Sequence, residues 1–541
     1  MKEEAPAQTP QGSTAPPEGD ESAPGVVGDF LRAHEQRRRH LPRAIVLGVL
    51  AGATAVAFTR SLVEADRLRT QFIAAAHSAL GAFGIFVPVL IGATGGALAL
   101  WLVRRFAPEA AGSGIPHLKG VLFNVRELRS VRVLVVKFLG GLAGIGGGFA
   151  LGREGPTIQM GGALGQLVSR WFRCNPRETQ TLLAAGAGAG LAAAFNAPLS
   201  GLVFVLEELQ RDFAPTVFTV TLVASATADV VARLLNGQMP VFHVQVEPIP
   251  ALQGLPVSLV VGLVAAVLGI AFNRSLVRML DLFQGLRSWP SWVPGAVAGA
   301  MVGVVGWFLP EALGGGHRLV EQTLSGQTPT AALPGLFGLR FGLTMVSYGC
   351  GAPGGIFAPL LVLGSELGLA IGNVAAALMP TVIDHPETYA VIGMSAYFSA
   401  IVRAPLTGVV LVVEMTGNDS LVLPLLVASL TAYGIADFLG DRPVYEALLE
   451  RDLLRGEERP ALAGTLLLDL TIEPGSPFGG RSVAEVGAPP GCVFVVLHRG
   501  PEEIVPASDT VLLPGDRATI VVAPSAAGAI AGLRRGASAR H

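Results

Sequence analysis

The sequence GAGAGLAAAFNAPLSGLVFVLE at residues 186–207 recurs in altered form as GMSAYFSAIVRAPLTGVVLVVE at residues 393–414. The two stretches align without gaps at an offset of 207 residues, and 10 of their 22 positions are identical. Upstream, GREGP at 152–156 corresponds to GIFAP at 355–359 at an offset of 203 residues. Paired apolar segments that are broken by glycine and proline are typical of inverted-repeat membrane proteins, in which a ligand site lies between the repeats.

The composition places this repeat in a membrane. The 541 residues are 51% hydrophobic and only 14% charged, whereas soluble domains are about 25% charged. Apolar stretches recur from about residue 43 to 439, and several are too short or too broken for a simple spanning helix of about 20 residues. We therefore predict an all-α polytopic membrane protein in which broken helices of two repeats meet inside the membrane. Its membrane domain spans residues 28–450, with halves at about 40–235 and 255–440.

The N-terminal segment is polar. Residues 1–27 are rich in Pro, Gly, Ser and Glu, which predicts a disordered tail. Arginines then precede the first apolar run, and this basic flank predicts a cytoplasmic N-terminus.

The sequence changes character after residue 440. A charged segment is followed by β-type runs at 465–472, 492–498 and 517–523, which Pro-Gly turns separate. We predict a small soluble β-rich (α+β) domain at 461–525 and a loose basic tail at 526–541.

Other classes of function find little support in the sequence. The net charge is only -2, so nothing indicates a nucleic acid as partner. An intramembrane enzyme would need a nucleophile–base pair or a metal cluster within the spans, and the histidines and the three cysteines show no such spacing. We therefore expect no enzymatic activity, no metal and no cofactor. The residues concerned are His243, His317, His385, Cys174, Cys350 and Cys492.

Three glycine-rich motifs, GSGIPH at 112–117, GREGP at 152–156 and GIFAP at 355–359, lie at the edges of apolar segments where helices can begin. A helix N-terminus attracts anions, and glycine lets the backbone approach them closely. A bare ion in a low-dielectric interior costs tens of kcal/mol, and one terminus contributes only about 0.3–2 kcal/mol. Several termini together with hydrogen bonds of about 1.5–3 kcal/mol each can hold an anion without a buried Lys or Arg. Weak, distributed binding also lets the ion leave.

These motifs in this order, followed by the tyrosine of RPVYEALL, resemble the CLC family of chloride channels and chloride/proton exchangers. The resemblance covers roughly residues 40–450. It implies an inverted repeat of tilted membrane helices. The function that it implies is transmembrane chloride transport as a chloride/proton antiporter, with chloride bound as a substrate ion, in a homodimer in which each subunit has its own pathway. A bacterial inner membrane with both termini cytoplasmic is the expected location.

The resemblance also implies residue roles. Ser113 and Tyr445 would contact the central chloride, as would backbone N–H groups around Ile356 and Phe357. Glu154 would be the external gate and proton carrier, and Glu208 the inner proton-transfer residue. The remaining motif residues implied to contact or support the ion are Gly112, Gly114, Ile115, Pro116, Gly152, Arg153, Gly155, Pro156, Gly355 and Pro359.

Physical chemistry supports the roles of these glutamates independently, because an ionisable residue in a membrane span is costly and indicates a functional site. A carboxylate that occupies an anion site when charged and leaves it when protonated links proton and chloride occupancy. Under the repeat alignment the two proposed proton carriers meet unlike residues, whereas the preceding glutamate is shared. The aligned pairs are Glu154 with Phe357, Glu208 with Met415, and Glu207 with Glu414. We therefore interpret the shared pair as structural, through capping or pairing.

Two positions depart from many family members. His117 stands where an acidic residue or Gln is usual, and Lys119 where some exchangers carry Glu. Lys137 matches a lysine of the family; if it lies close to Lys119, like charges would disfavour protonation of one of them. A passive voltage- or pH-gated chloride channel of the same fold is the alternative function, against which Glu208 argues. Transport of an organic anion would require a larger and differently lined pocket.

The C-terminal segment resembles the TrkA-C (RCK C-terminal) regulatory domain through the spacing of its strands and turns, with Asp509 and Pro514-Gly515-Asp516 in turn positions. Such domains commonly dimerise and bind small ligands. A packing module without a ligand is the alternative.

Overall fold

The structure is a computed structural model that describes residues 22–211, 213–237, 241–242, 252–286, 288–454, 466–500 and 502–538. Within residues 22–39, and at 527 and 531, only the backbone is described. The predicted disordered tail at 1–27 lies outside the described residues except for 22–27, which form the beginning of a helix.

The first half of the membrane domain consists of helices of very unequal length. The long ones are α1 (Ser22–Leu80), α2 (Phe86–Phe106), α4 (Ser130–Gly146), α5 (Glu154–Trp171), α6 (Pro176–Phe195) and α8 (Pro215–Asn236), and the short ones are α3 (Ile115–Leu122) and α7 (Pro198–Phe204). Two 3₁₀ turns, η1 (Gly81–Ile85) and η2 (Pro108–Ala110), and a π-helix, η3 (Val205–Leu209), complete it. Prolines at the first turns of α6, α7 and α8 fit because these positions need no hydrogen-bonded N–H.

The second half repeats this order. Its helices are α9 (Leu255–Gln284), α10 (Val293–Phe308), α11 (His317–Leu324), α12 (Leu333–Gly349), α13 (Phe357–Leu378), α14 (Thr388–Val402), α15 (Pro405–Thr416) and α16 (Val422–Phe438), with 3₁₀ turns η4 (Pro310–Ala312) and η5 (Thr330–Ala332). Helix α17 (Val444–Leu454) follows. Like α3, α11 has 8 residues, and like α4, α12 has 17, so the repeat predicted from sequence extends over whole elements.

Reciprocal contacts relate the two halves by a two-fold axis. Glu207 accepts hydrogen bonds from the backbone N–H of Leu406 (3.0 Å) and of Thr407 (2.7 Å) at the start of α15. In the other direction, Glu414 accepts from Leu199 N–H (3.0 Å) and Ser200 N–H (2.7 Å) at the start of α7. When residue i of one half contacts j of the other and the equivalent pair does the same, the halves are two-fold related. Of the two structural roles expected for Glu207 and Glu414, capping or pairing, these hydrogen bonds show capping.

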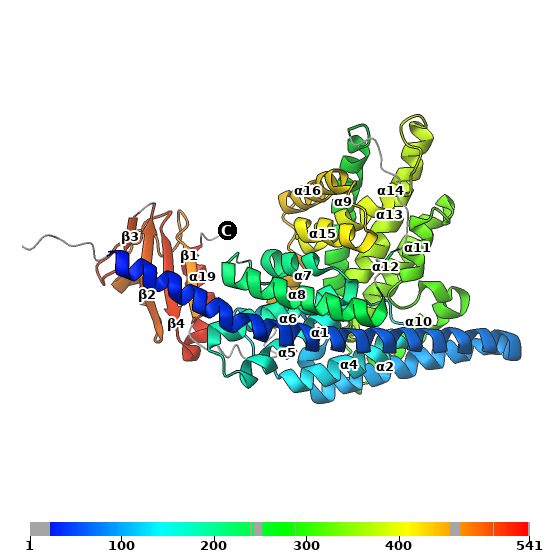
Figure 1. Cartoon of the computed structure of the whole chain (residues 1–541), viewed down its shortest axis with the longest axis horizontal. Helices are drawn as coiled ribbons and strands as arrows, with labels where there is room; N and C mark the ends of the chain where they lie inside the picture. The colour runs from blue at the N-terminus through cyan, green and yellow to red at the C-terminus, as the bar shows by residue number, and fades with distance from the viewer. Residues whose placement is uncertain are drawn as a thin grey trace, which may run out of the picture. The chain divides into compact units, whose positions relative to one another are not determined.

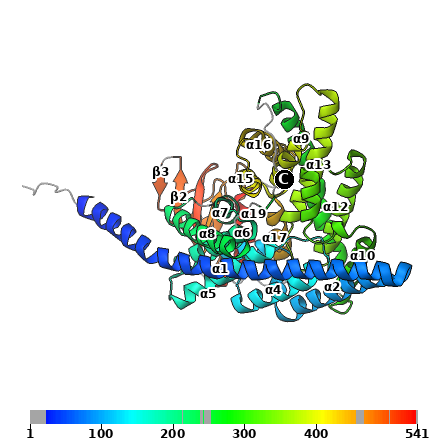
Figure 2. The same cartoon turned by 45° about the vertical axis from the view of Figure 1, so that its right-hand side comes forward.

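Glycine lets the two halves approach closely. Helix α2 of the first half packs along α10 of the second, and the two run side by side in both cartoon views (Figures 1 and 2). A Cβ built on Gly92 would collide with the carbonyl oxygen of Gly299, and one on Gly96 with that of Gly295. Spacing small residues four apart is how membrane helices bring their backbones together.

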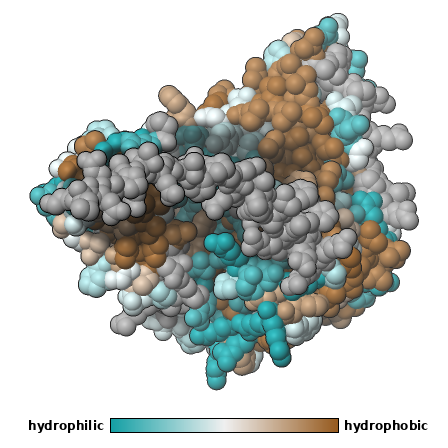
Figure 3. Space-filling view, turned by 60° about the vertical axis from the view of Figure 1, so that its left-hand side comes forward, coloured by the Kyte–Doolittle hydropathy of each residue, from teal (hydrophilic) through white to brown (hydrophobic). Residues whose placement is uncertain are grey.

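Within the part of the chain that the structure describes, four segments are long and apolar enough to cross a membrane, namely His40–Phe106, Pro215–Asn236, Leu255–Gln284 and Phe357–Leu378. Shorter apolar helices of 10–17 residues include Val293–Phe308 and Pro405–Thr416. Helix α9 exposes Leu259, Leu263 and Val267, and one face of the molecule carries a broad continuous area of hydrophobic side chains (Figure 3). An apolar surface of this kind suits contact with lipid.

The C-terminal domain is a four-stranded antiparallel sheet in the order β1-β4-β2-β3. Its elements are β1 (Leu466–Thr471), α18 (Val483–Val486), β2 (Cys492–Arg499), β3 (Glu502–Ile504), β4 (Arg517–Val522), η6 (Pro524–Ala529) and α19 (Ile530–Ala537). Three of these strands lie where the sequence predicts them.

The structure corrects the prediction for the end of this domain, where residues 526–541 were expected to form a loose basic tail. Helix α19 instead places Leu533 and Ala537 in the domain's hydrophobic core. Apolar residues at 530, 533 and 537 recur at helical spacing, and this pattern outweighs the basic charge of the intervening arginines.

Candidate anion and proton site

The three glycine-rich motifs meet in space. Gly152 and Gly355 exchange backbone hydrogen bonds of 2.7 and 2.8 Å, and Gly354 N–H donates to the carbonyl of Gly112 at 2.9 Å. A Cβ built on Gly155 would lie 2.8 Å from the Cα of Gly355 and 3.0 Å from the Cα of Ser113. Each loop therefore leaves no room for a side chain on the next, which explains why all three motifs are rich in glycine.

Contacts with Gln159 and Lys137 fix the conformation of the loop before α3. Gly114 has a φ of +79°, and a Cβ there would collide with the side chain of Gln159. This position therefore requires glycine for two reasons, its backbone conformation and the lack of space. The ammonium of the buried Lys137 donates to the carbonyls of Ala110 (2.9 Å) and Gly112 (2.6 Å). Because those carbonyls are engaged by a cation, the loop can present N–H and hydroxyl groups to an anion.

Ser113 and Tyr445 are both completely buried, as their predicted roles require. The Tyr445 hydroxyl has no hydrogen-bond partner among the described residues. The side chain that faces Ser113 is instead that of Tyr348 on α12, whose hydroxyl lies 3.4 Å from both the Oγ and the backbone N of Ser113. The sequence analysis missed Tyr348, although its position nine residues before Phe357, just ahead of the GIFAP motif, was an available signal.

Ile356 and Phe357 begin α13 and are wholly buried. Their N–H groups belong to the first turn, which has no intrahelical acceptors. The Phe357 ring packs edge-on against Phe204 and Phe398, at centroid distances of 5.6 and 4.8 Å, and lies 6.2 Å from the ring of Tyr445. This packing fixes the direction in which the start of α13 points.

Glu154 is the first residue of α5 and is wholly buried. Neither of its carboxylate oxygens has a hydrogen-bond partner among the described residues. One oxygen lies directly over Gly152, where any side chain would collide with it. No described ion pair joins Glu154 to the adjacent Arg153, which the structure places at the helix N-cap. The carboxylate therefore lies at the junction of the motifs, close to the backbone N–H of Ala358 in the first turn of α13.

Glu208 lies in the π-helix η3 and is also wholly buried. Its Oε1 is 2.7 Å from the ammonium of Lys119, which is itself only 2% exposed. The sequence analysis considered Lys119 as a like-charge neighbour of Lys137, but the structure instead pairs Lys119 with Glu208 and Lys137 with loop carbonyls. Pairing of residues 89 positions apart has no local sequence signal.

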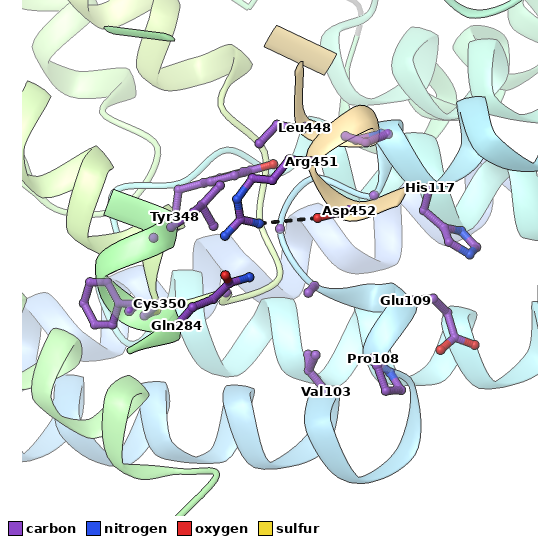
Figure 4. A pocket seen from close by; sticks show the side chains of 18 of the residues that line it. Val103, Pro108, Glu109, His117, Gln284, Tyr348, Cys350, Leu448, Arg451 and Asp452 are labelled. Carbon is purple, nitrogen blue, oxygen red and sulfur yellow. Dashed lines mark hydrogen bonds and ion pairs between the residues drawn. The ribbon is translucent and has the colours of Figure 1, made fainter. Parts of the chain in front are cut away.

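A cavity of about 480 Å³ adjoins the Ser113 loop and is lined by Gly112, Gly114 and Tyr348 (Figure 4). Arg451 and Gln284 point into it from α17 and α9, and Arg451 contacts Asp452 at 3.4 Å. The charged residues of its lining are Arg104, Arg126, Arg451, Glu109 and Asp452. Two of these arginines are paired with carboxylates, Arg126 with Asp452 and Arg451 with both Asp281 and Asp452, so the lining is polar and carries charges of both signs.

Comparisons with known proteins agree with this geometry. A family model described as voltage gated chloride channel matches residues 95–437, and one described as TrkA-C domain matches residues 467–533. The H(+)/Cl(-) exchange transporter ClcA of Vibrio parahaemolyticus is 40% identical over 427 residues, which are 77% of this chain and 91% of that protein. ClcA of Salmonella paratyphi B is 39% identical over 450 residues, or 80% and 94% of the two chains.

Among solved structures, a slow cyanobacterial Cl-/H+ antiporter superposes with a TM-score of 0.74 at 36% identity, covering 78% of this chain and 99% of that one. A eukaryotic CLC transporter superposes with a TM-score of 0.65 at 22% identity, covering 76% and 74%. At that level of identity the second likeness bears on the fold alone.

Proposed function

The chain belongs to the voltage gated chloride channel (CLC) family, and we propose that it exchanges chloride for protons across a membrane. The observation that carries this proposal is the carboxylate of Glu154, which is buried without a described partner where the three motif loops converge. The names of the relatives, which are exchange transporters, support coupling over passive conduction.

The proposed anion seat uses hydrogen-bond donors only. Ser113, Tyr445 and the first-turn N–H groups of α13 converge there, and no cationic side chain is assigned to it. Each hydrogen bond to a charged group is worth about 1.5–3 kcal/mol. A few of them offset the loss of hydration without holding chloride so tightly that it cannot leave.

Glu154 supplies the coupling in this mechanism. As a carboxylate it can occupy the anion seat itself, because the donors that hold chloride serve it equally well. Protonation removes the charge of Glu154 and with it the strong hydrogen bonds to those donors. Chloride then enters the anion site as the Glu154 side chain leaves it with its proton. Each binding event then changes the affinity for the other ion by the same factor, as linkage requires.

The test is chloride-driven proton movement in proteoliposomes that contain the full chain. An imposed chloride gradient should move protons uphill in the wild type. Glu154→Gln, which cannot carry a proton in this way, should abolish that movement. Chloride flux without proton movement in the wild type would contradict exchange and favour the passive channel, and absence of any chloride flux would contradict the substrate.

We further propose that the protein is a homodimer in a bacterial cell membrane with both termini in the cytoplasm. The proposal draws on the bacterial relatives and on the arginine-rich flank of the first span. Cross-linking in the native membrane and protease protection of epitopes at each terminus test these statements. For the C-terminal domain we propose binding of a small ligand, which the match to the TrkA-C domain supports.

A further inference from the structure

Four charged side chains from three segments form a network around Glu208. Lys119 of α3 lies 2.7 Å from Glu208 and 3.9 Å from Glu446 of α17. Arg211, which follows η3, lies 3.9 Å from Glu208 and 2.5 Å from Glu446. Both cations therefore contact both carboxylates, and the four charges sum to zero.

Exposure increases steadily across this network. The side chain of Glu208 is 0% exposed and that of Lys119 is 2% exposed, whereas Glu446 is 39% and Arg211 is 49% exposed. The network is therefore a continuous polar connection from solvent to a glutamate that no bulk water reaches. Of its two carboxylates, only that of Glu446 can exchange a proton with the solution directly.

The two carboxylates lie within reach of each other. Lys119 Nζ lies 2.7 Å from Oε1 of Glu208 and 3.9 Å from Oε1 of Glu446. The separation of these two oxygens therefore cannot exceed the sum of the two distances. One or two water molecules can bridge such a gap. The other oxygen of Glu208, Oε2, has no hydrogen-bond partner among the described residues. It therefore offers a buried lone pair on which a proton can arrive.

Lys119 occupies the position from which charge movement can be compensated. A buried ammonium is costly unless a carboxylate faces it. If Glu208 gains a proton and Glu446 loses one, the negative charge moves from the first to the second. Lys119 can follow by turning from Glu208 toward Glu446, which it already approaches, so neither state leaves it unpaired.

We propose that Glu446 takes up protons from the cytoplasmic solution and supplies them to Glu208, with Lys119 as a positioning residue. In each step a proton leaves the carboxyl of Glu446 through bridging water and binds Oε2 of Glu208. Glu446 becomes a carboxylate and Glu208 a neutral carboxyl, so charge and protons balance. This inference rests on the proposed exchange function and identifies the residue that feeds its inner glutamate.

The location of Glu446 connects this route to the anion site. It follows Tyr445 directly, and α17 begins at Val444, so one helical turn carries both the buried hydroxyl and the exposed carboxylate. A movement of this turn that alters one also displaces the other. The sequence analysis singled out Tyr445 of RPVYEALL and passed over the residue beside it.

The experiment compares Glu446→Gln with Glu450→Gln in the full chain, reconstituted as above. Glu450 is a matched control because it lies one turn further along α17, is 45% exposed, and pairs with an arginine as well, Arg442. Glu446→Gln should lower the chloride-driven proton flux about tenfold or more, as expected for loss of a proton-transfer group, and lower the ratio of protons to chloride. Glu450→Gln should retain the wild-type ratio.

The outcomes separate this inference from the function on which it rests. If wild type couples and Glu154→Gln does not, but Glu446→Gln matches wild type, only the inference is overturned. If both Glu446→Gln and Glu450→Gln reduce the ratio equally, the effect belongs to the helix and the inference is also overturned. If wild type moves no protons, the exchange function itself fails.

The positioning role of Lys119 is tested by measuring how the coupled proton flux depends on pH. If Lys119 had a purely structural role, its substitution would not shift this pH profile. The charged groups around Glu208 are Lys119, Arg211 and Glu446. Lys119→Met removes one cation that favours the charged carboxylates, so the two glutamates should retain a proton to higher pH and the profile should shift to higher pH. Lys119→Arg should restore it. An unshifted profile in Lys119→Met, with folding verified by chromatography, would contradict the positioning role.

Discussion

Glu154, Glu208 and the half-buried Glu207 differ in what surrounds their carboxylates, and these differences separate their roles. Glu207 has both oxygens committed to helix N–H groups, so it is a fixed structural anion. Glu208 has one oxygen 2.7 Å from the ammonium of Lys119 and the other 3.9 Å from Arg211. Glu154 has no described partner for either oxygen. Because an unpaired buried charge is costly, Glu154 has the strongest reason of these three to exchange its proton or its place with another anion.

Two of the buried tyrosines, Tyr348 and Tyr445, make distinguishable predictions for chloride binding. The Tyr445 hydroxyl has no described partner, so an anion is its natural acceptor, whereas the Tyr348 hydroxyl already faces Ser113. Tyr445→Phe should weaken chloride binding by about 1 kcal/mol, or about fivefold in Kd. Tyr348→Phe should have a smaller effect, which acts through the orientation of Ser113. Calorimetric titration of chloride into purified protein measures both, and a larger loss in Tyr348→Phe would contradict the assignment.

At this scale the sequence predicted the loops better than the contacts between them. The three motifs are local patterns, so Ser113, Glu154 and Phe357 could be singled out from their neighbours in the chain. The Lys119–Glu208 pair and the Tyr348–Ser113 contact join residues that are far apart in sequence. Such contacts depend on how helices cross, which no single motif records.

Helices α7 and α15 begin where a glutamate of the opposite repeat half can cap them. Helices α7 and α15 have no cap from their own N-cap side chains. Each is capped instead by the glutamate at the end of the repeat in the opposite half, with the hydroxyls of Ser200 and Thr407 adding bonds of 2.5 and 2.7 Å. This reciprocal capping supplies the hydrogen bonds that a helix end inside a membrane cannot obtain from water.

The caps predict a loss of stability without a loss of coupling. Glu207→Ala leaves the N–H groups of Leu406 and Thr407 at the start of α15 without their acceptor, and should lower the free energy of unfolding by about 2 kcal/mol. Glu414→Ala should do the same at α7. Thermal unfolding in detergent measures the change, and proteoliposomes containing the folded fraction should retain the wild-type ratio of protons to chloride.

Thr407→Ala is the milder control, since it removes only one hydroxyl and leaves both N–H bonds to Glu207 in place. Loss of proton coupling in Glu207→Ala at normal stability would show that this glutamate carries protons, and would overturn its structural role.

Elements were predictable where the pattern was local. The β-type runs and the Pro-Gly turns between them located β1, β2 and β4 to within about a residue or two. Strand β3 has only three residues, Glu502–Ile504, and carries no apolar alternation. Helix α19 was missed because its charge dominated its apolar spacing. The register of the sheet, in which β4 lies between β1 and β2, follows from long-range packing and was not available from the sequence.

At the scale of the whole molecule, the described residues form separate hydrophobic cores in the membrane domain and the C-terminal domain. The proposed anion and proton residues lie between Ser113 and Glu446, all within the membrane domain. The C-terminal domain therefore has its own determinants of stability. One of them is a turn in which Asp516, only 2% exposed, accepts two hydrogen bonds from Arg499 (2.9 and 2.8 Å) and one from Leu513 N–H (2.7 Å).

This turn makes the C-terminal domain sensitive to acid. Burial alone would raise the pKa of Asp516, but the hydrogen bonds from Arg499 and Leu513 and the charge of Arg499 outweigh it, so the pKa is lowered. A carboxyl whose pKa is lower in the folded state stabilises that state above its unfolded pKa of about 3.9. That stabilisation is lost as the pH falls through the lower, folded value. We expect amide-exchange protection of β1 and β4 in the full chain, corrected for intrinsic rates, to decline on acidification.

Asp516→Asn should lower this protection at neutral pH and flatten its dependence on pH, because the substituted side chain has no charge to lose. Asp469→Asn is the matched control. Asp469 lies in the same sheet, but its side chain is 49% exposed and its contact with Arg517 is longer, at 3.6 Å. If Asp516→Asn retained the full acid dependence of the wild type, another carboxyl would control the domain. If the change in protection extended to α5 and α13, the two domains would unfold as one unit, and the C-terminal domain could report ligand binding to the transport site directly.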